Sequence, residues 1–411
     1  MARKYPLPSP IFDTLNNVLE NSYVLSDIKL PFANNDLKIA LEFLKQYDGN
    51  KSTFNCYRKE IERLIQWAWL LQEKSIINLK REDLEIYIKF CMKPPKSWIG
   101  LKIVSKFRTV DGDRVANPAW RPFIEKISKA KYKDGDIPSK ESYHLSQKTI
   151  QEIFVALGSF YNYIVAQNYS EQNPVAAIKQ KSKFIRKNQS SATIRRLSDI
   201  QWQAVVNAAK DMASKDPIKH ERTLFVISAL YLMYLRVSEL VKSERWSPQM
   251  NHFFQDSYQN WWFKTVGKGN KERKIAVNDD MLCALARWRK YLNLSPALPS
   301  PDDNSPLVPK LRGNDNVTDT KMIYLIVQNC FNNTIDSLNK NNQTEEADNL
   351  LQASSHWLRH TGISDAINKF ERPIAHVRDD AGHASSATTD RYNDITLLER
   401  HASARKGKLE H

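Results

Sequence analysis

The sequence is poor in cysteine and has no long apolar run. Its 411 residues include four cysteines, Cys56, Cys91, Cys283 and Cys330, and no two of them form a CxxC pair. This spacing excludes a disulfide framework or cysteine zinc site and predicts buried thiols in a reducing compartment. No stretch is apolar for long enough to span a membrane. The first residues, MARKYPLPSPIFDTL, lack the apolar segment of a secretion signal. We therefore expect a cytoplasmic protein with no membrane partner.

Acidic residues are outnumbered by basic ones. The chain has 61 Lys and Arg against 46 Asp and Glu, a formal net charge of +15, which favours a polyanionic partner such as nucleic acid. The segment KQKSKFIRKNQSSATIRR, residues 179–196, contains no acid at all. It predicts a basic interdomain linker over 181–196 that is either a solvated tether or lies along phosphates. The candidate DNA-binding residues of this segment are Lys179, Lys181, Lys183, Arg186, Lys187, Arg195 and Arg196.

The first half of the chain has helical periodicity. Leu37, Ala40, Leu41 and Leu44 share one helical face, and further helices are predicted over 52–74, with Ser52 or Thr53 as its N-cap, over 80–92 and over 146–169. Residues 93–145 carry several Pro and Gly and predict an insertion that is partly loop. We expect an N-terminal segment, 1–34, and a helical DNA-binding domain, 35–180. The insertion's candidates for reading bases are Lys96, Lys102, Lys106 and Arg108.

The second half mixes helices with a hairpin. Helices are predicted over 197–212 with Ser198 as the cap, 222–242, 279–292, 319–338, 355–370 and 372–383. Residues 261–277 read as a β-hairpin whose turn is Gly-Lys-Gly-Asn, and residues 295–319 and 340–349 as loops. The predicted fold class is mainly α with a small antiparallel β-sheet. A helical domain precedes an α+β domain, 197–408, and residues 409–411 resemble the remnant of an expression tag.

Several cationic residues of the second domain are candidates for a site, although each has an ordinary explanation. Arg236 follows a very apolar stretch, where it either extends to water or is held by Glu239, three residues on. Lys268 lies in the hairpin turn between two glycines, where most lysines are simply solvated. His356 and Arg359 are three residues apart, so a helix would place both on one face.

The stretch AGHASSATTDRY, residues 381–392, adds a histidine and a tyrosine with small residues between them. Tyr392 has an ordinary pKa of about 10, so it needs a base and nearby cations to act as a nucleophile. Taken alone, His383 and Tyr392 are most simply structural. Together with two arginines, another histidine and a lysine, they form a plausible site for phosphodiester cleavage. Here arginines clamp the phosphate, the tyrosine attacks, the lysine protonates the leaving 5′ oxygen and the histidines shuttle protons.

The order of these motifs resembles the tyrosine recombinase (phage integrase) family. The chain has LRVSEL, GKGNKERKIAV, HWLRHT, AGH and TTDRY, with Tyr392 nine residues after His383. The first domain also resembles the family's helical core-binding domain, including the NPV at 173–175. By this resemblance the six catalytic positions are Arg236, Lys268, His356, Arg359, His383 and the nucleophile Tyr392, with Glu239 in support.

The resemblance implies a site-specific recombinase that cuts and rejoins duplex DNA through a 3′-phosphotyrosyl intermediate, with no metal or other cofactor. It implies a specific DNA site with inverted-repeat symmetry and a homo-tetramer on two duplexes. It also implies a nucleoid-associated protein of bacterial, phage or mobile-element origin. The residues between His383 and Tyr392 would form a flexible connection to a short helix that carries the nucleophile.

Three alternatives stay open. A type IB topoisomerase uses a similar residue set to relax DNA without strand exchange. A non-catalytic DNA-binding regulator on the same scaffold would keep the fold without the chemistry. A zinc hydrolase built on His356, His360, His376 and His383 has the least support, because those histidines lack the spacing of metal ligands.

Overall fold

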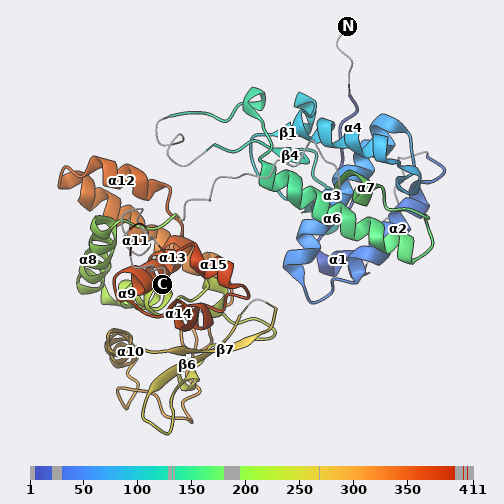
Figure 1. Cartoon of the computed structure of the whole chain (residues 1–411). Helices are drawn as coiled ribbons and strands as arrows, with labels where there is room; N and C mark the ends of the chain where they lie inside the picture. Colours follow the sequence, from blue (N-terminus) through green and yellow to red (C-terminus); the bar gives the residue numbers. More distant parts are fainter. Residues whose placement is uncertain are drawn as a thin grey trace, which may run out of the picture. The chain divides into compact units, whose positions relative to one another are not determined.

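The structure is a computed structural model that describes residues 5–20, 30–127, 132, 135–179, 195–267, 269–393, 401 and 405. The chain divides into two compact units, 1–191 and 192–411 (Figure 1). The predicted linker residues Lys181, Lys183, Arg186 and Lys187 and the hairpin residue Lys268 lie outside the described residues, as does the proposed tag remnant. Within the described ranges, no helix combines the length and apolar character needed to cross a membrane.

The first unit is a set of helices around one apolar core. These are α1 (Leu15–Glu20), α2 (Ala33–Lys45), α3 (Lys51–Trp67), α4 (Arg81–Met92), α6 (Gln147–Ala166) and α7 (Pro174–Lys179). The helix α6 packs against α2, α3 and α7, and the core includes the fully buried Phe43, Trp67, Tyr87 and Phe160. The four predicted helical segments are confirmed.

The predicted cap of α3 is wrong by two or three positions. Asn50 is the N-cap, and its side-chain oxygen accepts a hydrogen bond from the Thr53 amide at 3.2 Å. Asn is as good an N-cap as Ser, so the helix begins earlier than the serine and threonine suggested.

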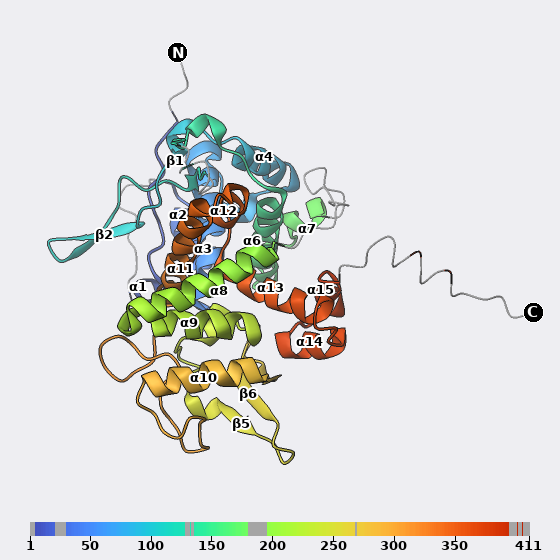
Figure 2. The same ribbon diagram turned by 90° about the vertical axis from the view of Figure 1, so that its left-hand side faces the viewer.

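The insertion carries two short pairs of strands. Strand β1 (Ile99–Gly100) pairs in parallel with β4 (Phe123–Ile124), and β2 (Phe107–Val110) pairs with β3 (Asp113–Ala116) in a hairpin that extends from its unit in Figure 2. The hairpin turn is Asp111-Gly112, and both residues have positive φ, 50° and 91°. Two-residue turns with positive φ match the twist of the flanking strands, which explains the Asp-Gly pair.

A buried carboxylate on α3 attaches both the N-terminal residues and the insertion to the helices. Glu62, whose side chain is 1% exposed, accepts hydrogen bonds from the amides of Ile11 and Phe12 and forms an ion pair with Lys106. Asp13 accepts two hydrogen bonds from Arg114, at 2.7 and 2.9 Å. Lys106 is thus engaged inside the unit, which contradicts the expectation that it reads bases.

The second unit contains the remaining helices and one sheet. The helices are α8 (Asp199–Lys215), α9 (Pro217–Leu232), α10 (Asp279–Tyr291), α11 (Thr320–Lys340), α12 (Thr344–Leu351), α13 (Ser355–Asn368), α14 (Ile374–Ala381) and α15 (Ser386–Asp390). The helix α9 packs against α8, α10 and α13 (Figure 2). Strands β5 (Phe253–Gln255), β6 (Trp261–Val266) and β7 (Glu272–Ala276) form an antiparallel sheet in that order, with α14 against β7. The fold class is therefore confirmed, as are the Ser198 cap and the hairpin.

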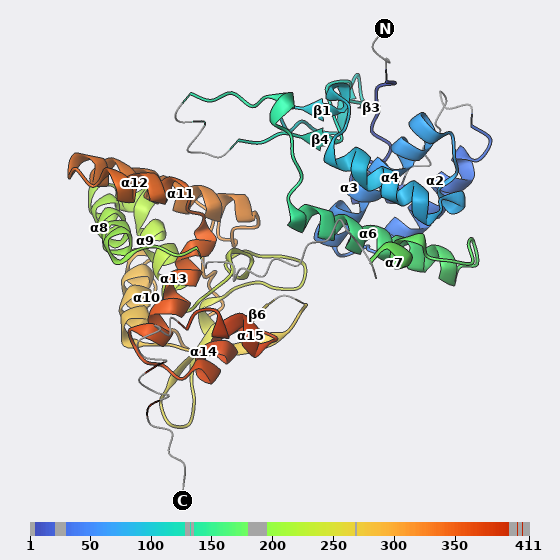
Figure 3. The same cartoon turned by 45° about the horizontal axis from the view of Figure 1, so that its top comes forward.

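Three local expectations for this unit are wrong. The apolar helix predicted over 222–242 ends at Leu232, and the chain turns at Tyr234, whose φ is 52°. The loop predicted over 340–349 contains most of α12, because Ala347 and Leu350 bury an apolar face. The connection between His383 and Tyr392 contains α15, so the helix precedes the tyrosine instead of carrying it. Figure 3 shows α13, α14 and α15 in succession.

The prediction of four buried thiols is also wrong in part. Cys91 and Cys330 are buried, whereas Cys56 and Cys283 are exposed. Both exposed thiols lie on outward positions of amphipathic helices, α3 and α10, a placement that cysteine spacing does not reveal.

We predict that Glu62→Ala destabilises the first unit by about 3 kcal/mol, because it leaves the partly buried Lys106 ammonium and two amides without their acceptor. Urea unfolding and hydrogen exchange of residues 5–14 measure the effect, and exchange should become faster there. The matched control is Glu141→Ala, which breaks an exposed pair with Lys96. Equal behaviour of the two variants would contradict the proposed role of Glu62.

Candidate active site

Arg359 is a buried cation at the centre of the second unit. Its side chain lies on α13, and the residue is 2% exposed. The guanidinium donates to the carbonyl of Tyr234, to the carbonyl of Ala381 at 2.6 Å, and to Nε2 of His383 at 3.3 Å. Burial, together with the neighbouring cation Arg236, lowers the pKa of Arg359 to about 9. The group is therefore still charged at neutral pH and holds two separate segments around itself, the turn at Tyr234 and residues 381–383.

Arg236 lies just after α9 and is held by Glu239. Its amide donates to Glu239 Oε2 at 2.8 Å, Nη1 to Oε1 at 3.1 Å, and Nη2 to the carbonyl of Gly382 at 3.3 Å. The Arg236 side chain is 26% exposed, and that of Glu239 is 1% exposed. The sequence allowed Arg236 either to extend to water or to be held by Glu239. The structure shows that Glu239 holds it.

A second arginine, Arg273 on β7, completes the pairing of Glu239. Its Nη1 and Nη2 donate to the two carboxylate oxygens at 2.7 and 2.8 Å, and its Nε donates to the carbonyl of Asp380 at 2.9 Å. Burial alone raises the pKa of Glu239, but the hydrogen bonds and charge of Arg273 outweigh it, so the pKa lies below its ordinary value. Sequence reasoning missed Arg273, although it lies in the same GKGNKER motif as Lys268.

Close packing around Arg273 explains two glycines of the motifs. A Cβ on Gly267 would lie 2.8 Å from Arg273 Nη1, and a Cβ on Gly382 would lie 2.8 Å from Arg273 Cδ. Gly382 also has φ of 62°, the left-handed C-cap of α14. Gly267 directly precedes Lys268 at the end of β6, so the hairpin turn begins beside the two arginines.

His383 makes contacts that define its tautomer. Arginine can only donate, so Nε2 of His383 must accept from Arg359, and Nδ1 carries the proton and donates to Thr389 Oγ1 at 2.8 Å. Burial, followed by the charges of Arg359, Arg236 and Arg273, lowers the pKa of His383 to about 4. The imidazole is therefore neutral at pH 7.

Tyr392 is buried beside His383. The residue is 4% exposed, and its ring stacks on that of His383 with centroids 6.1 Å apart and an interplanar angle of 15°. Its amide donates to the carbonyl of Thr389 at 2.9 Å, and its carbonyl accepts from Asn368 Nδ2 at 2.7 Å. Burial raises the pKa of the phenol to about 12, although the charge of Arg359 opposes the shift.

The Tyr392 hydroxyl is hydrogen-bonded to Nδ1 of His360. Sequence reasoning considered His360 only as a metal ligand, and its place directly after Arg359 on the helix was the available signal. His356, at the exposed start of α13, packs its ring perpendicular to that of His360, with centroids 4.3 Å apart. Partial desolvation and the charges of Arg359 and Arg236 lower the pKa of His356.

Comparisons with known proteins address the fold. No family model matches the chain. It is 28% identical over 169 residues to the tyrosine recombinase XerD of Rickettsia prowazekii (strain Madrid E). The aligned residues make up 40% of this chain and 51% of that protein. The chain thus matches about half the length of this curated relative.

Two solved structures of the XerH site-specific recombinase are similar along most of their length. A pre-cleavage complex with difH substrate has TM-score 0.50 at 16% identity, covering 98% of this chain and 99% of that one. A post-cleavage complex with palindromic difH substrate has TM-score 0.52 at 15% identity, and the similarity covers 95% of this chain and 93% of that one. The chain has the tyrosine recombinase fold. The family resemblance stated from the motifs is thereby confirmed.

In this tyrosine recombinase fold, five of the six residues singled out by the motifs belong to one connected group. Arg236, Arg359, His383 and Tyr392 are linked by the contacts given above, and His356 joins through His360. Lys268, the sixth, lies outside the described residues. Among the residues that the structure describes, no group of three or more His, Cys, Asp or Glu side chains is arranged to hold a metal ion.

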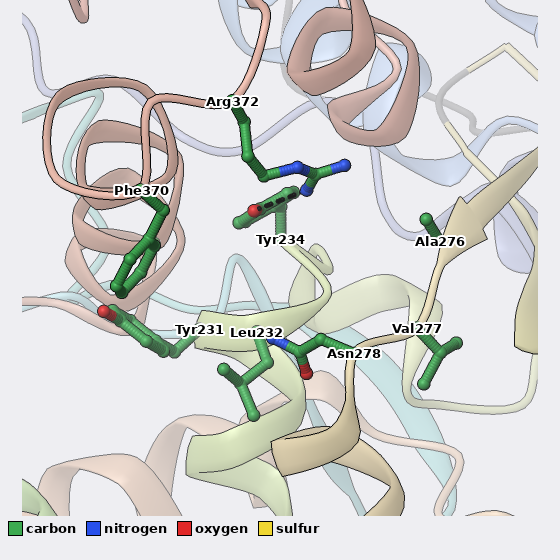
Figure 4. Close-up of a pocket in the computed structure, with 9 residues that line it drawn as sticks. Tyr231, Leu232, Tyr234, Ala276, Val277, Asn278, Phe370 and Arg372 are labelled. Carbon is green, nitrogen blue, oxygen red and sulfur yellow. Dashed lines mark hydrogen bonds between the residues drawn. The ribbon is translucent and has the colours of Figure 1, made fainter.

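A cluster of polar side chains stabilises the turn at Tyr234, whose carbonyl accepts a hydrogen bond from Arg359. Arg372 donates from Nη1 to the Tyr234 hydroxyl at 3.0 Å and from Nη2 to Asp380 Oδ2 at 2.6 Å, while Asp380 Oδ1 accepts from the Ala276 amide at 3.2 Å. Both Arg372 and Tyr234 line a cavity of about 290 Å³. Figure 4 shows Arg372 beside the Tyr234 ring. The positive-φ residue Tyr234 is thus fixed by both its carbonyl and its side chain.

The C-terminal end of the predicted linker, 181–196, and the residue after it contact α13. Arg196 donates to the Ser364 hydroxyl, and the Leu197 amide donates to Thr361 Oγ1 at 3.0 Å, both on α13. Arg195 is exposed. Lys179 is the last residue of α7, and its side chain is not described.

We predict that Glu239→Gln destabilises the second unit by about 3 kcal/mol at pH 7, because it removes the charge that pairs with Arg273 and Arg236. The folded-state pKa of Glu239 is depressed, so its stabilisation is present above pH 4.5 and is lost as the pH falls through the folded value. The difference between wild type and variant in urea unfolding should therefore shrink below pH 4.5. A difference that stays constant with pH would contradict this role. The control is Glu272→Gln, whose carboxylate pairs with Lys264 at the surface.

Proposed function

We propose that the chain is a site-specific DNA recombinase that cuts and rejoins duplex DNA through a 3′-phosphotyrosyl intermediate. The observation that carries the proposal is the position of the Tyr392 ring, stacked on His383, beside the buried cation Arg359. A phenol has little reason to be held against two histidines and an arginine unless negative charge is to develop there.

The chemistry follows from these groups. The Tyr392 oxygen attacks phosphorus, a bond forms between them, and the bond from phosphorus to the 5′ oxygen breaks. By the family resemblance, Lys268 protonates that leaving oxygen. The 5′ hydroxyl of a partner strand then attacks the phosphotyrosyl bond and releases the tyrosine. Because bond energy is kept in the covalent intermediate, no high-energy cofactor is required.

Arg236 and Arg359 would hold the non-bridging oxygens of the phosphate. A guanidinium presents a planar fork of donors that fits two such oxygens at once, and its charge stabilises the pentavalent transition state. Arg359 is oriented by two carbonyls, and Arg236 by the carboxylate of Glu239. The neutral His356 would add a hydrogen bond to the phosphate without adding charge, and His383 would help to orient Arg359.

The proposed partner is duplex DNA with a specific site of inverted-repeat symmetry, bound by a homo-tetramer that joins two duplexes. The helical domain, 35–180, would bind DNA, and the domain at 197–408 would carry the chemistry. The similar XerH recombinase was solved bound to its difH substrate, which supports a DNA partner. Integration, excision or resolution of DNA elements, in the cytoplasm and at the nucleoid, are the processes that such an activity serves.

A covalent-adduct assay tests the proposal. Duplexes selected from a random library for binding would be nicked near the preferred site, so that the released strand diffuses away and the phosphotyrosyl adduct accumulates. The full chain should form an adduct that resists denaturation, and Tyr392→Phe should form none. Arg236→Ala and Arg359→Ala should lose at least about 10²-fold in the rate of adduct formation while keeping most DNA binding.

Two outcomes would support the alternatives. Relaxation of supercoiled DNA that lacks any selected site, without strand exchange, would indicate a type IB topoisomerase. Tight, specific binding with no adduct from wild-type protein would indicate a non-catalytic regulator.

We also predict that the basic linker binds DNA phosphates. We expect replacement of Lys181, Lys183 and Lys187 with alanine to make DNA binding less sensitive to salt. The slope of log affinity against log salt concentration should become less negative by about one unit for each phosphate that a lysine no longer neutralises. Binding isotherms at several salt concentrations measure the slope. Removing three lysines elsewhere, Lys210, Lys215 and Lys219, controls for net charge. Equal flattening in both variants would argue against a specific role of the linker.

A further inference from the structure

The recombinase proposal leaves open which histidine takes the proton from Tyr392, and one histidine is in place to do so. His360 Nδ1 is hydrogen-bonded to the Tyr392 hydroxyl. Resting on the function proposed above, we infer that His360 positions this hydroxyl and accepts its proton as the oxygen attacks phosphorus.

The placement of His360 on α13 suits this role. His356, Arg359 and His360 are at positions i, i+3 and i+4 of one helix, so they share a face. The rings of His360 and Tyr392 have centroids 5.5 Å apart and an interplanar angle of 34°. A single rigid helix therefore presents the cation that would hold the phosphate and the base that would activate its attacker.

The two other histidines are less suited to take this proton. Both nitrogens of His383 are occupied, Nε2 by Arg359 and Nδ1 by Thr389, and its ring faces the phenol ring instead of the hydroxyl. The His356 ring lies across His360, with an interplanar angle of 81°. In the described part of the chain, the hydroxyl's hydrogen-bond partner is His360.

Without DNA, His360 is a neutral imidazole that can accept the hydrogen bond of the phenol but is a weak base. Burial and then the neighbouring His356, Arg359 and His383 lower its pKa to about 3, so the imidazole is neutral. The phenol, whose pKa is raised to about 12, donates to the lone pair of Nδ1, which puts the ring proton on Nε2. A DNA phosphate would offset the charge of Arg359 and make protonation of His360 less unfavourable. The nucleophile would thus be inert until a phosphate is bound.

The proposed step transfers one proton to His360 and exchanges one bond at phosphorus. The O–H bond of Tyr392 breaks and its proton moves to Nδ1 of His360, which becomes an imidazolium. The phenol oxygen forms its bond to phosphorus as the 5′ oxygen leaves and takes a proton from Lys268. On rejoining, the 5′ hydroxyl returns its proton to Lys268 and His360 returns its proton to the departing tyrosine.

Three variants of the full chain separate positioning from proton transfer in the assay with nicked duplexes. In His360→Asn, the side-chain oxygen lies near the position of the histidine Nδ1. It can accept the hydrogen bond of the Tyr392 hydroxyl but cannot take up its proton. His360→Leu removes both functions. His376→Asn, at an exposed histidine of α14, is the matched control and should react at the wild-type rate. We expect the rate of adduct formation to fall on the order of 10²-fold or more in His360→Asn and further in His360→Leu, with DNA binding retained.

A nucleophile of lower pKa supplies the decisive comparison. With 3,5-difluorotyrosine at position 392, the phenol ionises more readily and depends less on a base. The substitution should raise the rate of adduct formation by His360→Asn at least about tenfold and should change the wild-type rate little. A rate within threefold of wild type for His360→Asn, or no restoration by the fluorinated residue, would overturn the inference. If wild-type protein forms no adduct, it is the recombinase proposal itself that fails.

A measurement that needs no variant and no DNA tests the resting geometry. Nitrogen-15 NMR of histidine-labelled protein should show His360 neutral at pH 7 with its proton on Nε2. Observation of the Nδ1–H form would contradict the proposed donation from Tyr392, whatever the activity of the variants.

Discussion

The buried guanidinium of Arg359 is the constraint on which the candidate site depends. A charge removed from water must be surrounded by acceptors, and two of the three here are backbone carbonyls. The carbonyl of Ala381 is at the C-terminus of α14, where the helix dipole concentrates negative charge. The carbonyl of Tyr234 is offered by a residue with positive φ just beyond α9. The ends of two helices are thus shaped to solvate one cation.

This solvation requires α13 to lie very close to the end of α9. Gly362, one turn after Arg359, meets the carbonyl of Tyr231 so closely that a Cβ would overlap it. The helix α9 therefore has to stop where it does, because the next residues provide the acceptor for Arg359. A parallel arrangement holds on the other side of the site, where the carboxylate of Glu239 is enclosed by Arg236 and Arg273 and lies against Gly267.

Sequence patterns predicted the parts of this arrangement that depend on local chemistry. Apolar periodicity located most helices, Ser198 was recognisable as a cap, and the motifs identified Arg236, Arg359, His383 and Tyr392 as a set. The parts that failed depend on contacts between distant segments. The end of α9 is decided by an arginine more than a hundred residues later, and Lys106 is paired with a glutamate on α3. Arg273 and His360 were missed for the same reason. Each is important because of its contact with a distant residue, Arg273 with Glu239 and His360 with Tyr392.

The connection between His383 and Tyr392 shows how small residues can couple two functional side chains. It was expected to be flexible, yet it forms α15, and Thr389 at its end contacts both neighbours. The Thr389 hydroxyl accepts from His383 Nδ1, and its carbonyl accepts from the Tyr392 amide. Since His383 Nδ1 donates to that hydroxyl, any movement of Tyr392 that displaced Thr389 would also change how His383 meets Arg359. One threonine makes both contacts, one through its side chain and one through its backbone, so the position of the phenol and the hydrogen bonding of His383 are linked through a single residue.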